Sequence, residues 1–84
     1  RSAKPRLLIV APPACGPNAA GGRIVSESEL LAPLYRSLAT ELDCAFFDAG
    51  TVARVSAADG VHLDAENTAA IGRALIGPVV QLLA

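Results

Sequence analysis

The chain has 84 residues, 52% of them hydrophobic, and its seven lysines and arginines against eight aspartates and glutamates give a net charge of −1. This balance leaves no basic patch, so nucleic acid and anionic membrane surfaces are not expected partners, and no apolar run approaches the roughly 18 residues of a transmembrane helix. So short a chain makes one domain at most, and its apolar content exceeds what it can cover, so part of that surface should face another chain.

The chain begins with the pattern of a strand followed by a loop. Arg6 to Ala11 is a leucine-rich and β-branched run closed by Pro12-Pro13, which predicts a fully buried parallel strand and is too short for a signal peptide. Pro12 to Gly22 is rich in Pro, Gly and Ala and predicts a loop at the carboxyl end of that strand. Open α/β sheets carry their sites at this end, although a plain surface connection is an equal interpretation.

A helix and a second strand follow. Ser26-Glu27-Ser28-Glu29 has the form of a capping box and predicts a helix to about Leu42, in which Pro33 marks either a kink or a later start. The predicted helix has an apolar stripe that we expect in the core, formed by Leu30, Leu31, Leu34, Tyr35, Leu38 and Leu42. Cys44 to Phe47 predicts a second short strand, and Asp48 after it is expected to accept from loop amides rather than to take part in chemistry.

The C-terminal part of the chain has a helical pattern. Thr51 to Ala58 is a linker without a clear pattern, and Asp64 has the features of an N-cap before an acidic first turn. The helix is expected to run to about Leu83 and to be kinked or split by Gly77-Pro78. Its core stripe is formed by Ile71, Leu75, Val79 and Leu82 or Leu83.

The two cysteines give no sign of a metal site. Cys15 and Cys44 are far apart in the sequence and match no metal-ligand spacing. Free thiols in a reducing compartment are the simpler interpretation, and a cytoplasmic location is the expectation.

The residues with the clearest chemistry are Asp59 and His62 in the stretch Asp59-Gly60-Val61-His62-Leu63, which holds the only histidine of the chain. Histidine can take and give a proton near neutral pH if a partner fixes its tautomer and ring orientation. At this spacing the Asp59 carboxylate can accept from Nδ1–H of His62 and leave Nε2 free to face a nucleophile. The alternative is that Asp-Gly forms an ordinary turn and the histidine is a polar turn residue.

Three stretches together resemble a known family. Asp59 to Glu66, Cys44 to Gly50 and Leu7 to Pro13 are similar, in order and spacing, to the C-terminal part of the SGNH (GDSL-type) serine esterases, with the small bacterial arylesterases and acetylesterases as the nearest subgroup. The resemblance covers nearly the whole chain. It implies a flavodoxin-like three-layer α/β/α fold with a parallel sheet, of which residues 1–84 form the C-terminal βαβ unit and final helix. It also implies catalytic roles for Asp59 and His62.

The chain departs from the family in lacking the nucleophile. The family's Gly-Asp-Ser block and its oxyanion-hole Gly and Asn blocks do not occur, and the serines present lie in none of these contexts: Ser2, Ser26, Ser28, Ser37 and Ser56. The resemblance therefore implies an esterase of small acetyl or aryl esters in which an N-terminal segment of the same enzyme supplies the serine and oxyanion hole. No cofactor or metal is expected, this chain alone should be inactive, and a homo-oligomer is expected.

Two alternatives belong to other functional classes. One is a non-catalytic α/β interaction module, in which Asp59 and His62 only cap a turn. The other is a flavodoxin-like binding domain, but no Gly-rich phosphate loop follows a strand, and Ala20-Gly21-Gly22 is too weak a signal to count as one.

Overall fold

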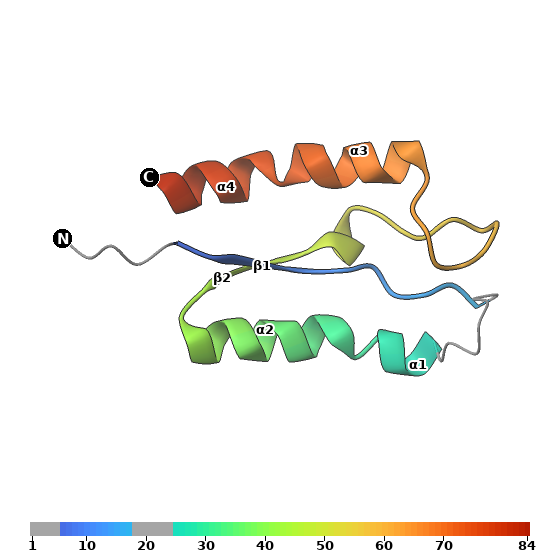
Figure 1. Ribbon diagram of the computed structural model, residues 1–84, viewed down its shortest axis with the longest axis horizontal. Coiled ribbons are helices and arrows are strands. Elements are labelled where there is room, and N and C mark those ends of the chain that lie inside the picture. The colour runs from blue at the N-terminus through green and yellow to red at the C-terminus, as the bar shows by residue number, and fades with distance from the viewer. Residues whose placement is uncertain (1–5, 18–24) are drawn as a thin grey trace.

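The computed structural model describes residues 6–17 and 25–84 and has three layers (Figure 1). Strands β1 (Leu8–Ala11) and β2 (Ala45–Asp48) pair in parallel, with Leu8 opposite Ala45 and Ala11 opposite Asp48. Helix α2 covers one face of this sheet, and helices α3 and α4 lie over the other. The predicted α/β class and the α/β/α layering are confirmed.

The segment between the strands forms two helices where the sequence predicted one. Helix α1 (Val25–Ser28) ends before Glu29, and α2 (Leu31–Leu42) begins two residues later, without a side-chain cap. The capping-box prediction at Ser26 is therefore wrong, because Ser26 lies inside α1. Pro33 is the third residue of α2, so it marks a later start, at a position where no intrahelical N–H bond is lost.

The C-terminal helix is split as predicted, but the break lies earlier. Helix α3 (Ala65–Ala74) and helix α4 (Ile76–Leu83) are separated by Leu75, so Pro78 also falls in a first turn. Asp64 caps α3, as predicted, by accepting from the Asn67 N–H at 2.8 Å. The carbonyl end of α4 is held by Arg6, whose Nη1 donates to the oxygens of Leu82 at 2.9 Å and Ala84 at 2.7 Å.

The core of the described part of the chain is small. Its buried hydrophobic residues are four alanines, at positions 11, 39, 49 and 53, and it contains no fully buried large side chain. The prediction that the first strand is fully buried is wrong. Val10 is 38% exposed, and within the described residues β1 has a strand partner on one side only. A two-stranded sheet is too narrow to cover the apolar faces packed on it.

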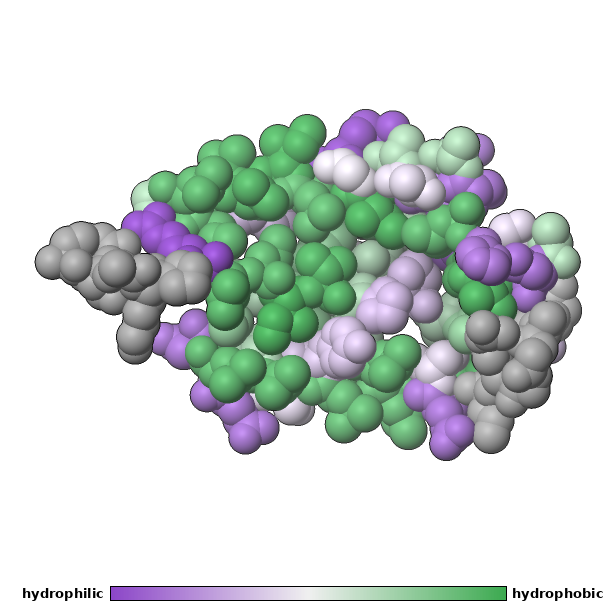
Figure 2. Space-filling view, viewed as in Figure 1, coloured by the Kyte–Doolittle hydropathy of each residue, from purple (hydrophilic) through white to green (hydrophobic). Residues whose placement is uncertain are grey.

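The predicted core stripe of α2 is divided between two environments. Leu31 and Tyr35 are half-buried and Ala39 is buried, so this line of the helix faces the sheet. A neighbouring line is exposed, by 44 to 61%, and we call it the leucine row: Leu30, Leu34, Leu38 and Leu42. On the other side of the sheet, Leu75 and Leu82 are half-buried while Val79 and Leu83 are exposed. Figure 2 shows hydrophobic residues across all three layers of the visible face.

Candidate active site

The loops that follow the two strands lie at one end of the molecule, on the right of Figure 1. After β2 the chain makes a short 3-10 helix, η1 (Ala49–Thr51), and Asp48 caps it by accepting from the Gly50 N–H at 2.9 Å. This confirms the structural role predicted for Asp48. The described part of the loop after β1, residues 12–17, reaches the same end, and residues 18–22 of that prediction lie outside the described residues.

Residues 56–62 form a closed loop, which we call the Asp-His loop. The Ser56 N–H donates to the His62 carbonyl at 2.7 Å, and the Ser56 carbonyl accepts from the Gly60 N–H at 2.8 Å. Gly60 has a φ of 70°, a conformation that a residue with a Cβ adopts only at a cost. Its carbonyl accepts from the Gly16 N–H at 2.8 Å, which ties the Asp-His loop to the loop after β1.

Asp59 and His62 make direct contact inside this loop. Oδ1 of Asp59 accepts from the backbone N–H groups of Val61 and His62, each at 2.9 Å, and Oδ2 lies 2.6 Å from Nδ1 of the His62 ring. An ionised carboxylate can only accept, so the hydrogen in this bond belongs to Nδ1. In the neutral ring Nε2 is then the acceptor, which is the arrangement a general base requires.

These hydrogen bonds keep Asp59 ionised. The His62 side chain first, and then the backbone N–H groups of His62 and Val61, lower the pKa of the Asp59 carboxyl well below its usual range. The pKa of Asp64, which ends the turn after the loop, is lowered by the backbone and then the side-chain amide of Asn67. The carboxylate beside His62 thus remains charged through the weakly acidic range.

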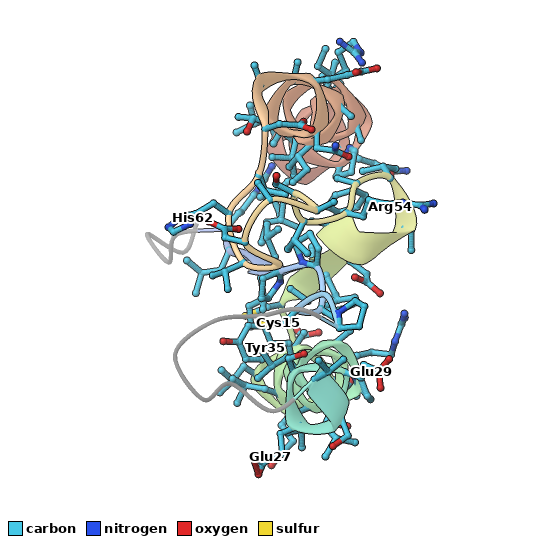
Figure 3. All side chains as sticks on the ribbon, turned by 90° about the vertical axis from the view of Figure 1, so that its right-hand side faces the viewer. Cys15, Glu27, Glu29, Tyr35, Arg54 and His62 are labelled. Carbon is cyan, nitrogen blue, oxygen red and sulfur yellow. The ribbon has the colours of Figure 1, made fainter. Side chains whose placement is uncertain are left out.

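The imidazole is open on its other side. The His62 side chain is 83% exposed and that of Asp59 is 40% exposed, and Figure 3 shows His62 projecting from the molecule on the side opposite Arg54. Within the described residues, only Asp59 hydrogen-bonds to the ring. The hydroxyl of Ser56, at the start of this loop, accepts from the Ala58 N–H at 3.1 Å. In the described part, the His62 ring is therefore paired with the Asp59 carboxylate, and no described hydroxyl is hydrogen-bonded to it.

A cavity of about 680 Å³ lies at the same end but does not include this pair. Its walls come from the loop after β1, from the segment after β2 and from Asn67, and neither Asp59 nor His62 lines it. Arg54, which does line it, points to the opposite side from His62 in Figure 3. We therefore place the candidate site at the exposed imidazole and not in this cavity.

Two further findings concern ligands and membranes. Residues 6–17 and 25–84 contain no group of three His, Cys, Asp or Glu side chains arranged to hold a metal ion, and Cys15 and Cys44 are both free. In the same two ranges, every helix is too short or too polar to cross a membrane.

The sequence predicted the contact between Asp59 and His62, which the structure confirms, but not the residues that hold its loop. The sequence did not predict a role in the site for Gly16, Ser56 or Asn67. The Asn67 side chain accepts from the Arg54 N–H and donates to Asp64, each at 3.0 Å. The only sequence signal for it is its position three residues after the N-cap, where a side chain can reach back to the cap.

Comparison with solved structures identifies relatives of high similarity. A protein of Agrobacterium tumefaciens strain C58 assigned as an arylesterase is 62% identical, with a TM-score of 0.89 over 93% of this chain and 39% of its own. A carbohydrate acetylesterase family member from Sinorhizobium meliloti is 51% identical, with a TM-score of 0.87 over 94% of this chain and 40% of its own. The aryl esterase of M. smegmatis is 30% identical, with a TM-score of 0.80 over 93% and 39%.

No family model matches the sequence, and no curated protein matches it either. The chain spans about two fifths of the length of the structures it matches, and the matched region is their C-terminal part. The neighbours share the SGNH-hydrolase fold, in agreement with the α/β/α layers described above. In sequence and in fold, the chain belongs to the family of bacterial arylesterases and carbohydrate acetylesterases and corresponds to the C-terminal part of its members.

Proposed function

We propose that this chain supplies the base and the orienting acid of a serine esterase that hydrolyses small acetyl or aryl esters. The observation that carries the proposal is the 2.6 Å contact between Nδ1 of His62 and Oδ2 of Asp59, beside a ring whose remaining surface is open. The esterase activity assigned to the solved neighbours supports it. The serine and the oxyanion hole would come from an N-terminal segment of the same enzyme.

The chemistry follows from the tautomer that Asp59 selects. Nε2 of His62 takes the proton of the serine hydroxyl as its oxygen attacks the ester carbonyl, and Asp59 stabilises the resulting imidazolium. The imidazolium then gives this proton to the leaving alcohol, and an acyl-serine remains. A water molecule, deprotonated by the same ring, releases the acid and restores the serine. No step uses a metal or cofactor.

The surface to which the N-terminal segment binds is also part of the proposal. The guanidinium of Arg36 on α2 lies 4.6 Å from the centre of the Phe46 ring, on β2. Leu34 and Leu38 are two residues from Arg36, about 200° around the helix, so the leucine row lies on the opposite flank, toward β1. Within the described residues β1 has a strand partner on one side only, so its outer edge is open on this flank. We infer that the N-terminal segment adds to the free edge of β1 and covers the leucine row.

The apolar surface gives this docking a driving force. Burying a leucine side chain completely contributes about 2 kcal/mol, so covering the exposed half of each leucine in the row contributes about 1 kcal/mol per residue. Docking at β1 would also pair the free backbone groups of its outer edge. Both effects favour association at the edge that carries the apolar surface.

The test uses an enzyme that contains this chain in a complete fold. We define the joined enzyme as this chain fused behind the part of the Agrobacterium protein that it does not match, which keeps the order of the family. We expect turnover of p-nitrophenyl acetate by the joined enzyme and none by the 84-residue chain alone. A folded joined enzyme without turnover would contradict the proposed function.

The alternative of a non-catalytic turn accounts for only one of the two oxygens of Asp59. An aspartate that only caps a turn needs one oxygen for the Val61 and His62 amides, and Oδ1 already accepts both. Oδ2 is left for the imidazole, a contact that a cap does not need. The alternative of a plain interaction module therefore leaves the second oxygen and the ring orientation unexplained.

A further inference from the structure

Asn67 joins the two ends of the segment that carries the reactive pair. Its Oδ1 accepts from the backbone N–H of Arg54, before the Asp-His loop, and its Nδ2 donates to Oδ1 of Asp64, after the loop; both distances are 3.0 Å. Its own backbone N–H also donates to Asp64, at 2.8 Å. A single half-buried side chain thus bridges residues that lie ten positions apart on either side of Asp59 and His62.

Backbone hydrogen bonds also hold the Asp-His loop. Its bonds to Ser56 close the loop on itself, and the backbone bond from Gly16 to Gly60 connects it to the loop after β1. The Asn67 bridge connects the base of the loop to the first turn of α3, a helix of ten residues. Loosening this base would let the loop adopt a wider range of positions, and the 2.6 Å contact between Asp59 and His62 would be made in only part of them.

We propose that Asn67 is a positioning residue, which fixes the Asp-His loop on α3 and so fixes where the His62 imidazole meets the serine. This proposal rests on the proposed function for its effect on rate. Both halves of the amide are used, one as acceptor and one as donor, so the site requires this group. An aspartate of the same shape keeps the acceptor for Arg54 but places a second carboxylate against Asp64.

The expected defect lies in the chemical step. A misplacement of a reacting group by about 1 Å can lower a rate on the order of 10²-fold, so we expect Asn67→Ala in the joined enzyme to lower kcat roughly 10- to 100-fold with KM nearly unchanged. Asn67→Asp should show the same pattern, because its acceptor is kept and its donor is lost. The matched control is Thr68→Ala, one residue along α3. Within the described residues the Thr68 hydroxyl bonds to the Asp64 carbonyl alone, at 2.9 Å, and the variant should keep the parental kcat.

The second readout does not depend on turnover. Ring ¹⁵N chemical shifts distinguish the Nδ1–H tautomer of His62 from the Nε2–H tautomer, and the His62 signals in the joined enzyme are assigned by their loss in His62→Ala. We expect the Nδ1–H form in the parent and in Thr68→Ala, and a mixture of the two forms in both Asn67 variants. Tautomer populations remain measurable if the joined enzyme has no esterase activity, so a failure of the proposed function would be recognised separately.

Two results would overturn the positioning role. If the Asn67 variants melt at a lower temperature but keep the parental kcat and a pure Nδ1–H signal, the side chain only stabilises α3. If Asn67→Asp behaves as the parent in every readout, the donor to Asp64 has no function. A fall in kcat together with a mixed tautomer, against an unchanged Thr68→Ala, supports the proposal.

Discussion

Replacing Asp59 by asparagine tests the pair with almost no change of shape. Asp59 accepts three hydrogen bonds, at 2.9 Å from the N–H of Val61, 2.9 Å from the N–H of His62 and 2.6 Å from Nδ1. The amide oxygen of Asn can keep the two backbone bonds, so the turn should persist. The amide nitrogen then occupies the position of Oδ2 and donates to the ring, which places the ring proton on Nε2.

That tautomer cannot act as a base toward a serine, because Nε2 already carries a hydrogen. We expect kcat of the Asp59→Asn joined enzyme to fall roughly 10³- to 10⁴-fold, as when the aspartate of a Ser-His-Asp triad is replaced in this way. The assay is p-nitrophenyl acetate hydrolysis, with the melting temperature measured in parallel and expected to change little. Parental kcat in a folded Asp59→Asn variant would refute the assignment of Asp59 as the orienting acid.

Further predictions concern acid, the apolar surface and the loop. The pKa of the Asp59 carboxyl is lowered from its usual 3.8, so its hydrogen bonds contribute fully to stability above that pH and lose this contribution only at still lower pH. Carboxyl ¹³C NMR should therefore show no titration step of Asp59 between about pH 5 and about pH 3. A titration step in that range would contradict the hydrogen bonding described. In the joined enzyme, Leu38→Ala should lower the free energy of unfolding in urea by about 2 kcal/mol or more if the leucine row is covered, whereas a loss below about 0.5 kcal/mol would show that it stays exposed. Gly60→Ala should cost about 1 to 2 kcal/mol in the same assay because of the φ of 70°, and no cost would mean that the loop has another conformation. The 84-residue chain alone should melt without cooperativity or self-associate in gel filtration, and a cooperative monomer would show that its core is sufficient.

The parts of the site that the sequence predicted correctly depend on short-range contacts. Asp59 and His62 are three residues apart, and so are Asp64 and Asn67, which form the cap of α3. A turn or a helix end brings such neighbours together whatever the rest of the fold does. The strands were also predictable in position, because short apolar runs ended by Pro12 and Asp48 leave few other interpretations.

The incorrect predictions concern burial and helix starts, which depend on surroundings. The stripe on α2 was expected in the core as a whole, but the two-stranded sheet covers only the line that contains Leu31, Tyr35 and Ala39. Ser26 matches a capping box, yet the helix that packs on the sheet begins at Leu31. A sequence pattern shows that a face is apolar, but it does not show how much of that face a neighbour covers.

The contacts that hold the Asp-His loop could not be predicted, because they join distant positions. The Gly16–Gly60 bond and the Arg54–Asn67 bond depend on how the loops after β1 and β2 meet at one end of the sheet. Neither residue pair has a motif. Their role is visible only when the carboxyl ends of both strands are placed together.

The most direct test of the central claim is the replacement of His62 by alanine in the joined enzyme. The His62 side chain is 83% exposed, so its removal should leave the melting temperature close to that of the parent. Loss of a general base typically lowers the rate by 10²-fold or more, and we expect at least about that loss in kcat for p-nitrophenyl acetate. A folded His62→Ala variant that keeps more than about a tenth of the parental kcat would show that His62 is not the base.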